Sequence, residues 1–225
     1  MERYERNGII TEKEQEFLKS ANVCVLGCGG LGGYIIEMIS RFGIGHITVV
    51  DGDVFNVSNL NRQILCTLNT LGRAKAFTAA ERLEIIDPSI EVKVLSVFVN
   101  EDNVNDIITG HDLIIDALDS NAVRRIVLKA CQTLKIPFVH GAIAGWYGQL
   151  CTIFPEDTFF RDYLREAQAS GIETKIGNPS FTPALMASYQ VSEAIKVLLN
   201  RGSLVREQLM YFDLFNNEIE IIRGK

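Results

Sequence analysis

A glycine-rich stretch at residues 22–33, which reads NVCVLGCGGLGG, constrains the fold of this chain more than any other feature. A short apolar run leads into five glycines, and apolar residues at helical spacing follow at 34–39. This order is typical of a strand, a tight turn and a helix. The turn requires positive φ angles, and a phosphate can approach only a backbone without Cβ atoms, so glycine suits both needs. The first N–H groups of the helix would then face that anion.

The spacing of the glycines predicts a nucleotide site. Gly27, Gly29 and Gly32 fit the pattern G-x-G-x-x-G. A predicted strand at 46–50 ends just before Asp51, which lies nineteen residues after Gly32. An acid about 20 residues after such a turn holds a ribose hydroxyl in nucleotide-binding folds. The alternative is a structural glycine turn that binds no ligand.

Predicted strands and helices alternate through the first two thirds of the chain, which implies a parallel, doubly wound sheet. The almost wholly apolar segment at 112–117 is typical of a strand buried on both faces. The other elements expected before residue 141 are helices at 11–20, 72–86, 102–109 and 121–134, and strands at 91–99 and 137–140.

The pattern changes in the last third of the chain. We predict an α/β fold with a Rossmann-like doubly wound sheet, parallel in the first half, to which the C-terminal part adds antiparallel strands. The later elements expected are a strand at 148–154, a helix at 159–169, a helix from an N-cap at Thr182 to about Asn200, and a hairpin with strands at 208–214 and 218–222.

The chain is expected to form a single domain over residues 1–225. Its nucleotide-binding core would span about 21–154, followed by a crossover segment at about 155–181 and a C-terminal helix and hairpin at 182–225. The crossover segment is polar and shows no strand pattern, and long irregular segments of this kind are often functional.

Composition limits the class of protein. A net charge of −6 argues against nucleic acid as the main partner. The five cysteines are dispersed and form no C-x-x-C pair, so we expect no zinc site and a reducing compartment. The sequence shows no apolar signal region and no run of about 18 apolar residues, so we expect a cytoplasmic protein that does not enter a membrane.

Polar residues gather where the early strands end, which is where ligands bind in such sheets. An oxidoreductase that binds NAD needs the glycines and the ribose acid, but not several cations and a further acid. A triphosphate with Mg²⁺ needs both, because charge on the phosphate oxygens must be neutralised during transfer. Each residue alone has a simpler reading, and Asp119 could cap the helix at 121–134. The residues concerned are Asp51, Asp53, Asn59, Arg62, Gln63, Arg73, Lys75, Asp119 and Asn121.

Four motifs together resemble the ThiF/MoeB/HesA family of ubiquitin-activating-type adenylyltransferases. They read VLGCGGLGG, VVDGDVFNVSNLNRQ, GRAKA and DALDSN. The block SNLNRQ is the most specific of them, since an NAD-binding protein has no reason to carry it. The resemblance runs from Arg3-Tyr4-x-Arg6 to EAIKVLL at 193–199 and so covers nearly the whole chain.

The resemblance implies that ATP lies on the glycine loop, with Asp51 on the ribose and Mg²⁺ bound by Asp119. Arg6 matches an arginine that reaches the neighbouring protomer's site, which implies a homodimer. The residues implied in catalysis are Arg6, Arg62, Lys75 and Asp119. The residues implied in nucleotide binding are Gly27, Gly29, Gly30, Asp51, Asp53, Ser58, Asn59, Arg62, Gln63, Lys75, Asp119, Ser120 and Asn121.

The substrate implied is the C-terminal Gly-Gly carboxylate of a small ubiquitin-like sulfur carrier protein of the thiamine or molybdopterin type. Its attack on the α-phosphate would give an acyl-adenylate and pyrophosphate. A carboxylate is already ionised at pH 7, so this step needs no general base. Accordingly His46 and His111 are interpreted as structural, and His140 as a residue that lines a pocket.

The chain departs from the family pattern in its cysteines. Many relatives carry two C-x-x-C pairs for zinc, and several also carry a cysteine in the crossover segment that bonds the carrier; this chain has neither. Covalent relay through that segment is therefore not expected, and Cys24, Cys131 and Cys151 are interpreted as core residues. We expect an enzyme that makes the acyl-adenylate and leaves sulfur transfer to another protein. Cations at Arg161, Arg165 and Lys175 could meet an acidic carrier surface, or could simply be solvated.

Three other functions remain open from the sequence. The chain could activate another carboxyl or amide, in a peptide or in a modified tRNA nucleoside, as the dehydratase branch of the family does. It could be a non-catalytic nucleotide-binding partner with the same fold. It could also be an NAD oxidoreductase.

Overall fold

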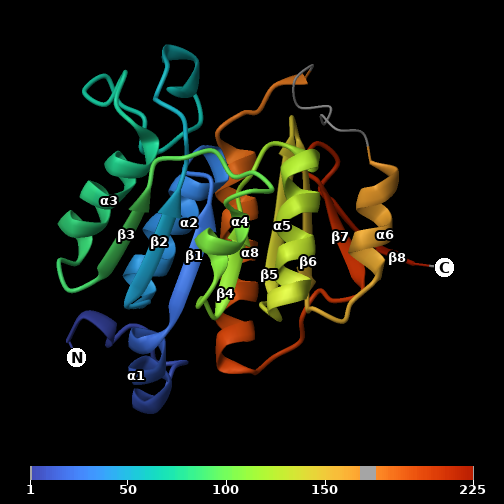
Figure 1. Ribbon diagram of the computed structural model, residues 1–225, viewed down its shortest axis with the longest axis horizontal. Coiled ribbons are helices and arrows are strands. Elements are labelled where there is room, and N and C mark those ends of the chain that lie inside the picture. Colours follow the sequence, from blue (N-terminus) through green and yellow to red (C-terminus); the bar gives the residue numbers. More distant parts are fainter. Residues whose placement is uncertain (1, 168–175, 225) are drawn as a thin grey trace.

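The computed structural model describes residues 2–167 and 176–224. Within these ranges the strands form one eight-stranded sheet in the order β3-β2-β1-β4-β5-β6-β7-β8 (Figure 1). The strands are β1 (Asn22–Leu26), β2 (His46–Val50), β3 (Glu91–Leu95), β4 (Leu113–Asp116), β5 (Phe138–Ala144), β6 (Tyr147–Ile153), β7 (Gln208–Asp213) and β8 (Glu218–Arg223).

The direction of the strands changes once along the sheet. β1 pairs parallel with both β2 and β4, so that Val25 lies opposite Val49 on one side and Ile115 on the other. The strands from β3 to β5 are all parallel, whereas β6, β7 and β8 are joined as antiparallel neighbours. The predicted fold class is therefore confirmed.

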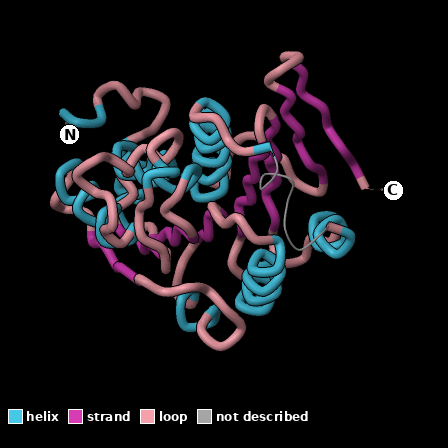
Figure 2. The backbone as a smooth tube through the Cα atoms, turned by 90° about the horizontal axis from the view of Figure 1, so that it is seen from above, coloured by secondary structure: helices cyan, strands magenta, loops and turns pink. Residues whose placement is uncertain are grey.

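Helices cover both faces of the sheet, as the view from above shows (Figure 2). On one face α2, α3 and α8 pack together, and on the other face α5 packs between α4 and α6. The helices are α1 (Glu12–Ser20), α2 (Gly30–Phe42), α3 (Lys75–Ile86), α4 (Val104–Ile108), α5 (Asn121–Leu134), α6 (Phe159–Glu166) and α8 (Phe181–Leu199), with short 3₁₀ turns at η1 (Glu2–Tyr4) and η2 (Val57–Asn59).

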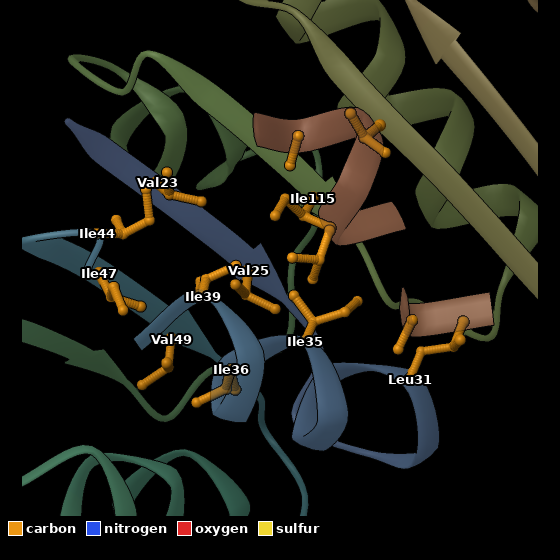
Figure 3. Close-up of a cluster of buried hydrophobic side chains, with 14 of the residues drawn as sticks. Val23, Val25, Leu31, Ile35, Ile36, Ile39, Ile44, Ile47, Val49 and Ile115 are labelled. Atoms are coloured by element: carbon orange, nitrogen blue, oxygen red, sulfur yellow. The ribbon is translucent and has the colours of Figure 1, made fainter. Parts of the chain in front are cut away.

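Strand β1 shows why the sheet needs cover on both faces. Its side chains alternate, so Val23 and Val25 join the core with α2, whereas Cys24 and Leu26 join the core with α4 and α5. All four are at most 1% exposed. Figure 3 shows the first of these clusters, in which Val25 packs beside Ile35 and Ile39 of α2. Strands of this kind read as continuous apolar runs because both faces are buried.

Most predicted elements are found close to their expected bounds. The helix expected at 121–134 is α5 with the same bounds, and the capping box of Thr11 and Glu14 opens α1. Of the helix expected at 159–169, residues 168 and 169 lie outside the described residues, and α6 ends at Glu166. No helix in the described ranges is both long enough and apolar enough to cross a membrane. The division into one domain with a core, a crossover segment and a C-terminal part stays a prediction.

Three predicted boundaries were wrong for identifiable reasons. The helix expected from residue 72 begins only at Lys75, because Ala74 pairs in a β-bridge with Val54 and Gly72 has a positive φ of 76°. The strand expected at 91–99 ends at Leu95, where its pairing with β2 ends. The strand expected to end before Gly141 continues to Ala144, because β5 pairs with β6 along its whole length.

The start of α8 was also predicted wrongly. Ser180, not Thr182, is the N-cap residue, and Thr182 lies inside the helix with no exposed area. Its hydroxyl donates a 2.6 Å hydrogen bond to the carbonyl of Gly145, in the turn between β5 and β6. The predicted cap is thus a buried link between α8 and the sheet.

Candidate active site

A cavity of about 190 Å³ lies where β1, β2 and β4 end, at the carboxyl edge of the parallel half of the sheet. Ligands bind at this edge in open α/β sheets, at the point where neighbouring crossovers run to opposite faces. Many of the residues predicted for the site line it together: Gly27, Gly29, Gly30, Asp51, Asp53, Arg62, Gln63, Lys75 and Asp119.

The glycine loop brings three backbone segments close together. Gly27 has a φ of 100°, and a Cβ atom there would lie 2.5 Å from the carbonyl oxygen of Ala117. A Cβ atom on Gly32 would lie 1.8 Å from the carbonyl oxygen of Gly27. Both contacts are far closer than side chains permit, so only glycine allows α2 to start against β1 and β4.

The N-terminus of α2 is open toward the cavity. The N-cap residue is Gly29, which offers no side-chain cap, and Gly29, Gly30 and Leu31 all line the cavity. A Cβ atom on Gly30 would lie in ordinary van der Waals contact with Pro183, at 3.6 Å, so the backbone here tolerates a close neighbour without overlap. Uncapped N–H groups at the positive end of a helix form a binding site for an anion.

Asp51 faces the glycine loop in a fixed orientation. Its two carboxylate oxygens accept hydrogen bonds from the backbone N–H groups of Cys28 and Asp53, each at 2.8 Å. Burial raises the pKa of Asp51 above its ordinary value, and these two N–H donors partly offset the rise. Each oxygen keeps a lone pair, so the carboxylate can still accept hydrogen bonds from hydroxyl groups of a ligand.

Two cations predicted for phosphate binding line the cavity. Lys75 is only 7% exposed, and its Nζ lies 3.0 Å from an oxygen of Asp53. Arg62 is partly buried and donates from Nη1 to the carbonyl of Ser58 and to the side chain of Asn61. Both keep further N–H groups for a ligand, because an ammonium has three donors and a guanidinium five.

Two amide side chains in the cavity have unpaired oxygens. Gln63 Oε1 and Asn178 Oδ1 are buried and have no hydrogen-bond partner within the described residues. Buried polar atoms without a partner are rare, so these two indicate a ligand that would satisfy them. No sequence motif predicted Asn178, which reaches the cavity because the side chain of Asn61, 117 positions earlier, donates a 3.1 Å hydrogen bond to its carbonyl.

Four residues predicted to bind the nucleotide do not line this cavity. Asn59 caps its own turn by accepting a hydrogen bond from Asn56, and Ser58 is exposed. Ser120 is the N-cap of α5, and Asn121 accepts a hydrogen bond from Arg124 at 2.7 Å. The capping role considered for Asp119 is therefore wrong, and Asp119 is an exposed carboxylate at the cavity wall. The roles of all these residues stay predictions.

Arg6 lies away from the cavity of its own chain. The N-terminal segment sits at the end of the sheet where β1 starts, whereas the cavity lies where β1 ends (Figure 1). Arg6 is exposed and has no hydrogen bond or ion pair with any described residue. Any role of Arg6 in catalysis would therefore need the site of another copy of the chain.

A buried charged cluster beside the cavity was not predicted. Asp116, at the end of β4, is fully buried and accepts hydrogen bonds from Arg124 Nε at 2.9 Å and His140 Nδ1 at 2.7 Å. Its other oxygen accepts from the N–H of Leu118 at 2.9 Å. The sequence held one sign of this cluster, since Asp116 ends the otherwise apolar strand β4. A charged side chain buried at that position requires a partner of opposite charge.

The cluster has a clear electrostatic balance. Burial alone would raise the pKa of Asp116, but the Arg124 guanidinium and the His140 ring outweigh it and hold that pKa below its usual value. Burial lowers the pKa of His140, so the ring is neutral at pH 7. His140 lines a second cavity next to the first, as predicted, while His111 bonds Thr48 at 2.7 Å and His46 lies 3.2 Å from Glu91.

The cysteines of this chain lie in the core. All five cysteines are free and buried, which confirms Cys24, Cys131 and Cys151 as core residues. Burial raises the pKa of each thiol, to about 12 for Cys131, so these thiols are poor nucleophiles at pH 7. Within residues 2–167 and 176–224, no three His, Cys, Asp or Glu side chains converge to hold a metal ion.

Comparison with known proteins gives consistent results over the whole chain. The model of the ThiF family matches residues 4–225. The molybdopterin-synthase adenylyltransferase of Salmonella typhimurium is 32% identical over 236 residues, which cover 100% of this chain and 94% of that protein. The sulfur carrier protein ThiS adenylyltransferase of Bacillus subtilis is 33% identical over 229 residues, which cover 99% of this chain and 68% of that protein.

A solved structure of similar fold contains a nucleotide. The E. coli tRNA N6-threonylcarbamoyladenosine dehydratase TcdA in complex with ATP is 28% identical and superposes with a TM-score of 0.74. The match covers 86% of this chain and 91% of that chain.

We predict that Asp116→Asn lowers the free energy of unfolding at pH 7 by about 3–5 kcal/mol, because it leaves Arg124 buried without its charged partner. The folded pKa of Asp116 lies below its unfolded value, so its contribution is present above about pH 4 and is lost as the pH falls through the folded pKa. Urea denaturation at several pH values measures both effects.

The matched control is Asp106→Asn on α4, whose side chain is exposed. It should change the unfolding free energy by no more than about 0.5 kcal/mol. Equal effects of the two substitutions would contradict the assignment of Asp116 as the centre of the charged cluster.

Proposed function

The chain belongs to the ThiF family and is a nucleotidyltransferase, and we propose that it uses ATP to adenylate the C-terminal Gly-Gly carboxylate of a small ubiquitin-like sulfur carrier protein. The observation that carries the proposal is the cavity at the carboxyl ends of β1, β2 and β4. It joins an uncapped helix N-terminus, the carboxylate of Asp51 and two cations, Arg62 and Lys75. Relatives named for adenylation of sulfur carrier and molybdopterin-synthase proteins support the substrate class.

The proposed reaction needs positioning and charge neutralisation rather than acid–base chemistry. A carboxylate oxygen attacks the α-phosphorus of ATP, the bond to the β-phosphate oxygen breaks, and pyrophosphate leaves with both electrons of that bond. The carboxylate is already ionised at pH 7, so no base is required. The N-terminus of α2, Arg62 and Lys75 would bind the phosphates and oppose the charge that develops on them.

The residues present fit a nucleoside triphosphate with Mg²⁺. The uncapped helix N-terminus at Gly29 and Gly30, which lines the cavity, and the unpaired oxygen of Gln63 suit a bound ligand. Mg²⁺ in nucleotide sites takes one or two carboxylates together with phosphate oxygens, so the single carboxylate of Asp119 suffices. When bound, the ion would supply positive charge at the phosphate oxygens.

The acyl-adenylate is proposed to pass to a sulfur donor on another molecule. All five thiols are buried with raised pKa values, and residues 155–181 contain no cysteine. The chain therefore offers no thiolate that could receive the acyl group. This supports adenylation without a covalent relay.

A second candidate function has one specific observation in its favour. The similar structure that contains ATP is a tRNA dehydratase, at 28% identity. Activation of an amide or carboxyl on a tRNA nucleoside would use the same phosphate-binding residues. The net charge of −6 weighs against a tRNA substrate, because RNA binding depends on positive charge along the phosphate backbone.

Exchange of labelled pyrophosphate into ATP tests the proposal directly. Small Gly-Gly-ended proteins encoded near this gene should support exchange, and the same proteins without the two glycines should not. ATP binding without exchange for any carrier would favour a non-catalytic nucleotide-binding protein. Retention on tRNA at moderate salt, with ATP turnover that depends on tRNA, would favour the second candidate. Tight binding of a nicotinamide cofactor would instead favour the function of an NAD oxidoreductase.

We predict that Asp119→Ala lowers the rate of pyrophosphate exchange by about 100-fold or more, because the metal-binding carboxylate is lost. Asp106→Ala is the control, since that exposed acid on α4 lies outside the cavity lining. Full exchange activity of the Asp119 variant, with a carrier that the wild type also uses, would refute the role of Asp119.

We further predict that Arg6 acts in the site of a partner subunit in a homodimer. The variants Arg6→Ala and Asp119→Ala should each be nearly inactive, whereas an equimolar mixture that exchanges subunits should recover about one quarter of the wild-type rate. Half of the dimers are then mixed, and each mixed dimer has one complete site. A mixture no more active than its components, with subunit exchange shown by mass spectrometry, would rule out this arrangement.

A further inference from the structure

A second cavity of about 270 Å³ adjoins the first and has no assigned role in adenylation. It lies between α5 and α6 and strands β5, β6 and β7. The two cavities share three lining residues, Arg124, Ala142 and Ile143. A molecule could therefore place one end at the nucleotide and the adjoining atoms in the second cavity.

The lining of the second cavity is almost entirely neutral. Arg124 is the one charged side chain among its described lining residues, and the other polar side chains are Asn121, His140, Tyr147, Gln149, Tyr163 and Tyr211. Three of the five N–H groups of Arg124 already donate, to Asp116, to Asn121 and to the carbonyl of Leu118, and Asp116 neutralises its charge. Such a cavity suits a neutral chain with dispersed polar groups, as a peptide backbone is, and does not suit a charged group.

His140 presents a single unused polar atom beside this cavity. A carboxylate only accepts hydrogen bonds, so the 2.7 Å contact with Asp116 places the ring proton on Nδ1 of the neutral imidazole. Nε2 is then a pure acceptor. It is buried and has no partner in the described part of the chain, in a side chain that is 2% exposed. An unpaired buried acceptor is costly, so a ligand with an N–H group would gain by meeting it.

We propose that His140 is a specificity-determining residue whose Nε2 accepts a hydrogen bond from the N–H of the last peptide bond of the substrate. The proposal rests on the proposed function, which places the carboxylate beside the nucleotide. In a peptide, the Cα atom next to the terminal carboxylate is bonded to this amide nitrogen. Because the two cavities share lining residues, a carboxylate in the first cavity would place the nitrogen at the second. The site thus selects carboxylates that carry an acylated amine, and rejects fatty or keto acids that lack the N–H.

The test removes the donor and the acceptor separately. A carrier that supports pyrophosphate exchange is prepared by ligation with either a natural terminal glycine or N-methylglycine, which lacks the N–H. In the wild type, N-methylation should lower kcat/KM for exchange about three- to tenfold, the worth of one hydrogen bond. In His140→Asn this penalty should disappear, because the Asn amide keeps the donor to Asp116 at the Nδ1 position but has no atom at Nε2.

Two further variants make the result interpretable. His140→Gln carries an amide at the Nε2 position and should restore part of the penalty. Tyr163→Phe removes a hydroxyl from the same cavity and should leave the full penalty in place. ATP affinity and the midpoint of thermal unfolding, compared with those of the wild type, show whether each variant is folded. An unchanged penalty in folded His140→Asn overturns the proposal while the proposed function stands.

A measurement on the unliganded protein tests the same residue without a substrate. ¹⁵N NMR of labelled histidine should show His140 at pH 7 with its proton on Nδ1 and none on Nε2. A protonated Nε2 would overturn the proposal. If the wild type shows no exchange with any Gly-Gly-ended carrier, the proposed function fails and the substrate role of His140 fails with it.

Discussion

The contact between the backbone of Gly32 in α2 and Gly27 in the turn after β1 determines the geometry of the whole carboxyl edge of the sheet. A methyl group at Gly32 would overlap the carbonyl oxygen of Gly27, and one at Gly27 would press on Ala117 after β4. Because these segments touch through backbone alone, the N-terminus of α2 comes to lie at the ends of β1 and β4. The anion site therefore follows from packing, before any polar side chain is considered.

Asp116 extends this arrangement to the neighbouring cavity. Its carboxylate holds the guanidinium of Arg124, which lines both cavities, and the ring of His140, which lines the second. A fully buried charge is tolerated here because Arg124 neutralises it, and because the neutral His140 ring and a backbone N–H also donate to it. The same interactions that neutralise the carboxylate fix the orientation of the groups around it, so the walls of the two cavities are positioned as one unit.

The sequence predicted the order of elements well because local patterns determine them. The apolar runs of β1 and β4, the glycine turn and the helix at 121–134 all depend on residues next to one another, and all were found. Boundaries failed where a distant partner decides them, as for β5, whose length depends on its antiparallel neighbour β6. In the site, the residues of the glycine loop and Lys75 could be predicted by motif, but Asn178 and His140 could not be assigned partners. Their positions depend on contacts across 117 and 24 residues of chain.

Lys75 loses most of its side-chain conformational entropy when the protein folds, before any ligand binds. Its side chain is 7% exposed at the start of α3, and Asp53 holds its ammonium at 3.0 Å. A free lysine would lose rotamer freedom when a phosphate arrives, at a cost of up to about 2 kcal/mol. Here that entropy has already been lost, so an incoming anion meets a preorganised charge that has only to share or exchange one carboxylate partner. The positive charge of the cavity is therefore in position before an anion binds, and does not have to be ordered by the anion.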